Sequence, residues 1–192
     1  MNLEEISKYS KAVEYATVAH NGQIRKISGL PKIVHPYSVS VILLEYGYPV
    51  DLAIAGLLHD VVEDCEEYSI KDIEDNFGKN VANYVKDVTE PVKSIPWKSR
   101  KIEYINHIKN ANDFSKALCA ADKIHNLLSI YKDMQKQGIN IFNKFNASRS
   151  DEIWFYTSVY NALIQDEKKE IEIYKTYKRI LNIVIEEVAK YE

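Results

Sequence analysis

The amino-acid sequence predicts an all-α protein built as a single domain. Apolar side chains recur at helical spacing almost throughout, and no segment shows the strict alternation that is typical of a β-strand. Only 6 of the 192 residues are glycine and 5 are proline, while 46% are hydrophobic, which favours a compact helical fold over a disordered one. This length suits one domain with a sizeable core.

The first half of the chain is expected to contain five helices, at residues 3–20, 35–46, 51–64, 70–77 and 79–88. Pro36 suits the first turn of the second helix, where a missing N–H costs little. Asp51 is the expected N-cap of the third helix. Ser69 and Asp72 have the spacing of a capping box for the fourth, which should end before Gly78.

The second half is expected to contain four more helices, at residues 98–110, 114–131, 151–164 and 167–191. Residues 90–97 form a connection, and residues 137–149 form a polar loop. The last helix carries a row of apolar residues that can pack on the rest of the fold: Ile173, Tyr177, Ile180, Val184 and Val188. We therefore expect residues 1–192 to form one domain that the helices at 151–191 complete.

Charge and cysteine content exclude several classes of protein. The net charge of -3 offers no general attraction for nucleic acid or membrane, and we expect neither as a partner. Cys65 and Cys119 form no metal or redox motif, so reduced thiols in a cytoplasmic protein are expected. The chain starts with acidic residues rather than a signal peptide, and no apolar run approaches the ~18–20 residues of a membrane span.

Residues 59–64 read HDVVED and bring three carboxylates and one imidazole together without a cation. No Lys or Arg lies between Lys32 and Lys71, although seven acids do: Glu45, Asp51, Asp60, Glu63, Asp64, Glu66 and Glu67. A solvated helix face would interleave Lys with such acids, and the helix dipole disfavours acids late in a helix. This cluster therefore predicts a divalent metal, with a solvated acidic face as the alternative.

On a continuous third helix, His59 would lie one turn before Glu63 and Asp60 one turn before Asp64, forming two adjacent rows. Gly56 would lie on the same face and leave room for a ligand. Two ligands bind a metal weakly, so further ligands are needed from other segments.

His35 and Asp122 are the candidates for those further ligands. His35 lies at the entry of a helix, where its ring can point inward. Asp122 lies in a stretch of small and apolar residues that should be buried, although it could instead pair with Lys123. Two imidazoles and two carboxylates suit Mn²⁺, Fe²⁺ or Zn²⁺.

Several segments match one known family in the order in which that family has them. They read AHNGQIRK at 19–26, SGLP at 28–31, IVHP at 33–36, LLHDVVED at 57–64, FGKNVA at 77–82 and ADKIHN at 121–126. The chain resembles the hydrolase domain of the RelA/SpoT homologues, within the HD-type metal-dependent phosphohydrolases, and looks most like the stand-alone small alarmone hydrolases. The matching segments span about 12–131.

The resemblance implies hydrolysis of the alarmone (p)ppGpp at its 3′-pyrophosphate, which gives GDP or GTP and pyrophosphate in the stringent response. It assigns a metal, usually Mn²⁺, to His35, His59, Asp60 and Asp122. It assigns the hydrolytic chemistry to Glu63 and Asp64. It assigns contacts with the nucleotide to Arg25, Lys26, Asn126 and Ser129. From the sequence alone, Arg25 and Lys26 could equally belong to a solvated basic loop.

Two departures from the family pattern bear on the substrate or the site. Lys32 stands where an aromatic residue is usual, which bears on the pocket for the base or ribose, and Lys123 stands where Arg is usual. An HD phosphohydrolase acting on NADPH or another phosphorylated nucleotide is therefore the first alternative. A non-catalytic module that binds the alarmone is the second, and a helical interaction protein without a ligand is the third.

Overall fold

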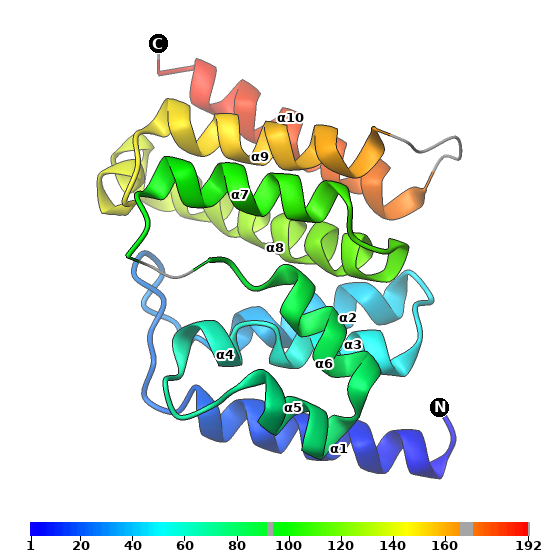
Figure 1. The fold of residues 1–192 in the computed structure, drawn as a ribbon. Coiled ribbons are helices and arrows are strands. Elements are labelled where there is room, and N and C mark those ends of the chain that lie inside the picture. The colour runs from blue at the N-terminus through cyan, green and yellow to red at the C-terminus, as the bar shows by residue number, and fades with distance from the viewer. Residues whose placement is uncertain (92–93, 166–170, 192) are drawn as a thin grey trace.

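The computed structural model describes residues 1–91, 94–165 and 171–191, and within these ranges it is helical (Figure 1). The α-helices are α1 (Leu3–Ala19), α2 (Val34–Glu45), α3 (Val50–Leu58), α4 (Val61–Asp64), α5 (Ile70–Phe77), α6 (Lys79–Val88), α7 (Trp97–Lys109), α8 (Asp113–Gln137), α9 (Arg149–Ile164) and α10 (Glu172–Ala189). A 3₁₀ helix, η1, covers Ile139–Lys144. Over the same ranges, β-type pairing is limited to one isolated bridge between Ile24 and Pro31. The all-α fold class is confirmed.

Helix α8 is the central element of the fold. It packs against α2, α3 and α6 on one side and against α7, α9 and α10 on the other, and Figure 1 shows the N-terminal helices below it and the C-terminal helices above. Small buried side chains allow its neighbours to approach closely: Ala117, Cys119, Ala120 and Ala121. A residue on the buried face of α8 therefore lies where both groups of helices meet.

Local capping explains where several helices begin. The expected capping box at the start of α5 is present, because the Ser69 side chain accepts from the N–H of Asp72 and the Asp72 carboxylate accepts from that of Ser69. Asn2 and Glu5 form a second box at α1. Four of the five expected packing positions on α10 are buried and Ile180 is half-buried; the expected start of that helix at residue 167 lies outside the described residues.

The third helix is not continuous, contrary to the expectation from its apolar periodicity. Helix α3 ends at Leu58, His59 and Asp60 form a turn, and α4 follows. The ring Nδ1 of His59 donates to the Gly56 carbonyl oxygen at 2.8 Å, so the side chain takes an acceptor that a continuing helix would use. The prediction that His59, Asp60, Glu63 and Asp64 form two rows on one straight helix is therefore wrong.

Three further expectations are corrected. Asp51 is not an N-cap, since Pro49 holds that position and Asp51 pairs with Lys8 at 2.6 Å. Gly56 leaves no room for a ligand, because a Cβ there would lie 3.0 Å from Leu43 Cδ1 and 3.2 Å from the Ser40 backbone. The polar loop expected at 137–149 contains η1, whose Ile141 and Phe142 are buried.

No helix in the part of the chain that the structure describes combines the length and the apolarity that crossing a membrane requires.

Candidate metal centre and cavity

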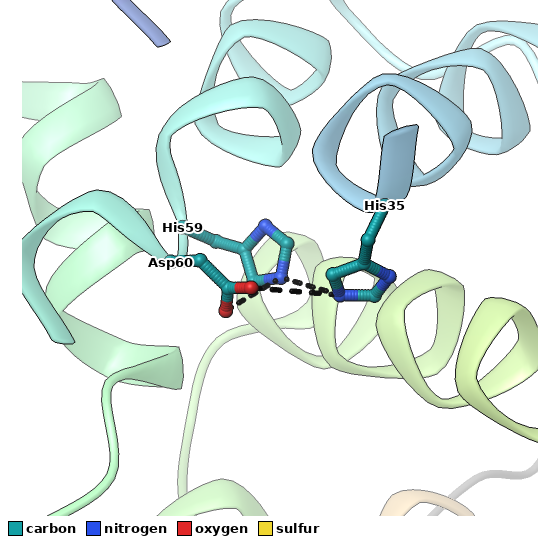
Figure 2. A group of neighbouring side chains, drawn as sticks. All are labelled: His35, His59 and Asp60. Atoms are coloured by element: carbon teal, nitrogen blue, oxygen red, sulfur yellow. Dashed lines mark hydrogen bonds and ion pairs between the residues drawn. The ribbon is translucent and has the colours of Figure 1, made fainter. Parts of the chain in front are cut away.

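His35, His59 and Asp60 point toward one another from two separate segments (Figure 2). His35 lies in the first turn of α2, and the other two lie in the turn between α3 and α4. The Nε2 atoms of the histidines are 3.2 Å apart, and His59 Nε2 lies 3.2 Å from Asp60 Oδ1. One potential ligand atom from each residue lies within 4.8 Å of the others. Such spacing allows all three to contact one ion.

Asp122 approaches the same point from helix α8. Its Oδ1 lies 3.0 Å from His35 Nε2 and 3.8 Å from His59 Nε2. The four residues expected to hold a metal therefore meet, although their roles as ligands stay a prediction. Asp122 also pairs with the buried Lys123 through Oδ2 at 2.6 Å, as the alternative for this residue expected.

Hydrogen bonds on the far side of each imidazole fix which nitrogen faces the cluster. Because the Gly56 carbonyl can only accept, His59 Nδ1 must donate, which directs Nε2 at the neighbouring carboxylates. His35 Nδ1 lies 2.6 Å from Nδ1 of His125, which leaves His35 Nε2 facing the cluster too. Histidine ligands of metals are commonly oriented by such second partners.

The cluster favours positive charge. Burial disfavours the charged form of His59, but the Asp60 and Asp122 carboxylates outweigh it and raise the pKa of His59 to about 9. Burial lowers the pKa of His35. The cluster thus offers two imidazole nitrogens and two carboxylates in a setting that stabilises positive charge. This donor set suits a divalent transition-metal cation such as Mn²⁺, Fe²⁺ or Zn²⁺.

Lys32 supplies the cation that the acidic segment lacks in its own sequence. Its Nζ lies 3.1 Å from Asp60 Oδ2 and also pairs with Asp64. The departure at Lys32 was expected to bear on the pocket for the base or ribose; its side chain lines the cavity and is paired there with these acids. The neighbouring carboxylates raise its pKa despite burial, so it keeps its charge.

The position of Lys32 leads to a testable prediction about metal affinity. Lys32→Met should increase the affinity for Mn²⁺ about tenfold, equivalent to ~1.4 kcal/mol, because it removes a charge that repels a cation bound at Asp60. Titration calorimetry of metal-free protein measures the change. Lys8→Met, which breaks the pair with Asp51 away from the cluster, is the matched control and should leave the affinity unchanged. An unchanged or weaker affinity in Lys32→Met would contradict this role.

The two acids expected to perform the chemistry are in different environments. Burial raises the pKa of Glu63 to about 7, with help from the Asp60 and Glu90 carboxylates. Asp64 is held by Lys32. Both line the same cavity as the cluster. Glu63 is therefore the group better suited to exchange a proton near neutral pH.

A cavity of about 690 Å³ opens beside the cluster and is lined by all four residues expected to contact the nucleotide: Arg25, Lys26, Asn126 and Ser129. Arg25 and Lys26 lie in the basic loop, which turns back on itself because the Arg25 N–H donates to the Leu30 carbonyl at 2.9 Å. Asn126 donates to Asp122 Oδ1 at 2.6 Å, and Ser129 donates to the His125 carbonyl at 2.9 Å. Asn126 therefore also positions a residue of the cluster, whereas the Ser129 hydrogen bond stays within its own helix.

A second charged group on the cavity wall was not predicted from the sequence. Glu90 accepts from Arg100 Nε at 3.0 Å and also pairs with Lys101, and all three line the cavity. Glu152, from α9, is only 7% exposed and interacts electrostatically with Lys101 and Glu90. These residues come from three segments without a shared motif, so local spacing carries no signal for them.

Glu152 should make the stability of the protein depend on pH. Burial raises its pKa from the ordinary value of 4.5 to about 7, against the opposing charge of Lys101. The folded state therefore keeps a proton that the unfolded chain loses, and stability should fall by on the order of 3 kcal/mol as pH rises from about 4.5 to 7. Glu152→Gln should remove this loss, so in urea titrations it should gain on the wild type between pH 5 and pH 8.

Glu186→Gln, at an exposed position of α10, is the control for that measurement and should follow the wild type at both pH values. Equal pH dependence in the wild type and Glu152→Gln would show that Glu152 does not keep its proton.

Comparison with known proteins identifies the family. The HD domain model matches residues 12–154. A guanosine-3′,5′-bis(diphosphate) 3′-pyrophosphohydrolase of Spiroplasma citri is 33% identical over 141 residues, which are 70% of this chain and 18% of that protein. The corresponding enzyme MESH1 of Xenopus tropicalis is 37% identical over 120 residues, which are 61% of this chain and 66% of MESH1. The match thus spans about a fifth of the first relative and about two thirds of the second.

Two solved structures share the fold. A metazoan orthologue of SpoT that hydrolyses ppGpp is 27% identical, with a TM-score of 0.76, over 92% of this chain and 95% of that one. A protein of Listeria monocytogenes EGD-e is 29% identical, with a TM-score of 0.71, over 79% of this chain and 99% of that one. These matches confirm the resemblance drawn from the sequence motifs. The chain belongs to the HD domain family, in the part of it that includes relatives named guanosine-3′,5′-bis(diphosphate) 3′-pyrophosphohydrolases.

Proposed function

We propose that this chain hydrolyses the alarmone (p)ppGpp at its 3′-pyrophosphate and releases GDP or GTP and pyrophosphate. The observation that carries the proposal is the meeting of His35, His59, Asp60 and Asp122 at the wall of a cavity that Arg25 and Lys26 also line. The names of the relatives support the choice of substrate. The cytoplasm is the compartment we propose, in keeping with two free cysteines.

The four clustered residues would hold the metal, for which we propose Mn²⁺, with Fe²⁺ or Zn²⁺ as the other cations that suit the donor set. When bound, such a cation supplies Lewis acidity, which lowers the pKa of a water molecule and screens phosphate charge. The Nδ1 contacts of His59 and His35 keep their Nε2 atoms directed at that position. Metal analysis of protein purified without chelators identifies the ion.

The chain's own residues account for the rest of the reaction. Glu63 accepts the proton of the attacking water, whose oxygen bonds to phosphorus while the bond to the 3′ oxygen breaks. Arg25 and Lys26 neutralise the phosphate charge that grows as this bond breaks, which lowers the barrier. The leaving 3′ oxygen takes up a proton from solvent, so the nucleotide product ends as a 3′ hydroxyl. Asp64, tied to Lys32, holds its place in the wall.

A panel of substrates with Mn²⁺ tests the proposal. Incubation with ppGpp should release GDP and pyrophosphate, while NADPH and simple nucleoside phosphates should react much more slowly. Release of phosphate from NADPH faster than release of pyrophosphate from ppGpp would instead favour the first alternative, a phosphohydrolase acting on NADPH. Tight binding of ppGpp without any product would make the chain a binding module instead.

A further inference from the structure

One face of α8 leads away from the metal cluster along the cavity. The residues on this face that line the cavity are Asp122, Asn126, Ser129, Ile130 and Asp133. Their spacing of three and four residues places them in one row along the helix. Eleven residues separate the first from the last, which is roughly 16 Å along the axis. This row can accommodate a nucleotide with its 3′ phosphates at the cluster and its base near Asp133.

Asp133 is the unusual member of the row because its charge is not compensated. The residue is 7% exposed, yet none of the hydrogen bonds or ion pairs formed among the described residues reaches its carboxylate. By contrast, Asp122 at the other end of the row has Lys123, Asn126 and His35 as partners. Among the described residues, His20 Nε2 is the one buried side-chain atom without a hydrogen-bond partner, so the Asp133 oxygens are not sealed inside the protein but open to the cavity. The place of Asp133 on the cavity wall means that a ligand can supply the missing donors.

The chemistry of a carboxylate restricts which base can do so. An ionised carboxylate only accepts hydrogen bonds, and it can accept two side by side. Guanine carries two adjacent donors on one edge, the N1–H and the N2 amino group. Adenine carries an acceptor, N1, at the corresponding place, so its lone pair would face the carboxylate. A site built around such a group rejects the base that lacks the matching donors.

Other residues of the cavity wall also suit a base. Phe145 lines the same cavity, and its ring is stacked on Phe142 with centroids 5.4 Å apart, which holds it in one orientation. Aromatic faces of this kind commonly stack on bases. Lys144, the neighbouring residue, also lines the cavity. The cavity that Asp133 lines thus also offers a stacking surface besides this pair of acceptors.

We propose that Asp133 selects guanine over adenine by accepting hydrogen bonds from N1–H and the N2 amino group of the base. This inference rests on the proposed function, since it specifies how that substrate's base is read. It assigns to Asp133 a role that no sequence motif of the chain indicated.

Binding of GDP and ADP to the wild type and to Asp133→Asn, measured by titration calorimetry, tests the proposal. The wild type should bind GDP roughly ten- to hundredfold more tightly than ADP, as expected for one good bidentate contact. Asp133→Asn, which keeps the shape but not the pair of acceptors, should lose most of this preference through weaker GDP binding. The ratio of kcat/KM for ppGpp to that for its adenosine counterpart should fall in parallel.

Asp113→Asn, at an exposed position near the start of the same helix, is the matched control and should keep the wild-type preference. A purely structural role for Asp133 would weaken GDP and ADP binding equally, and circular dichroism reports any loss of helix. An unchanged preference in Asp133→Asn, or no preference in the wild type, overturns the proposal. Selective GDP binding that depends on Asp133 but comes without pyrophosphate release would instead overturn only the proposed hydrolysis.

Discussion

Asp122→Asn is expected to reduce Mn²⁺-dependent hydrolysis of ppGpp on the order of a thousandfold, equivalent to ~4 kcal/mol of lost transition-state stabilisation. The carboxylate contributes Oδ1, which lies 3.0 Å from His35 Nε2, to the centre of the cluster. An amide keeps the size of the side chain but removes the charge that attracts the cation. Activity with saturating ppGpp and calorimetric Mn²⁺ affinity should fall together.

The same substitution has a side effect, which a second variant separates from the loss of metal. Lys123 is buried and pairs with Asp122, so Asp122→Asn leaves its charge without this partner and destabilises the fold. Asp60→Asn avoids this cost, because Lys32 keeps its pair with Asp64. Both variants should lose activity while retaining helical circular dichroism. Asp75→Asn, in an exposed pair with Lys71, is the control; full activity in either cluster variant would refute the proposed centre.

Glu63→Gln should lower kcat by about 10²- to 10⁴-fold while Mn²⁺ affinity stays close to that of the wild type. The side chain lines the cavity beside the cluster, and its raised pKa suits a group that accepts a proton. Single-turnover measurements with saturating metal isolate this step. A fully active Glu63→Gln would mean that the catalytic assignment is wrong.

The pH profile provides a second readout for Glu63. Its pKa of about 7 would be lowered by a cation bound at the cluster, so kcat of the wild type should rise with pH through a limb at or below pH 7. Glu63→Gln should lose this limb. Asp64→Asn is the matched comparison, because Asp64 is held by Lys32 and should matter less. A larger loss of kcat in Asp64→Asn than in Glu63→Gln would make Asp64, rather than Glu63, the group that accepts the proton.

The helices that the sequence predicts best are those with local signals at their ends. Helix α5 matches its expected range because Ser69 and Asp72 form the capping box that the spacing indicates. The break after Leu58 could not be predicted, because apolar periodicity continues through it and the cause is one ring-to-carbonyl bond. Helix α8 runs on to Gln137, past its expected end at residue 131. Its last turns are stabilised by tertiary packing that buries Met134, which local sequence does not indicate.

The candidate site was predictable where residue type alone restricts the chemistry. An acid among small apolar residues and a histidine at a helix start pointed to Asp122 and His35, and the structure brings them together. Pairing between distant segments carried no such signal. The pairing of Lys32 with Asp60 and Asp64 was missed for this reason, because these residues are about 30 positions apart in the chain and share no motif.

The separation of the four clustered residues along the chain also has a thermodynamic consequence. His35 comes from α2, His59 and Asp60 from the turn that follows α3, and Asp122 from α8. An unfolded chain therefore cannot present all four to one ion at once. Ion binding is therefore coupled to folding, and mass action adds the free energy of binding to that of the native state. The melting temperature should climb steadily with manganese concentration, and preparations that differ in metal content should differ in thermal resistance even when their helices are identical.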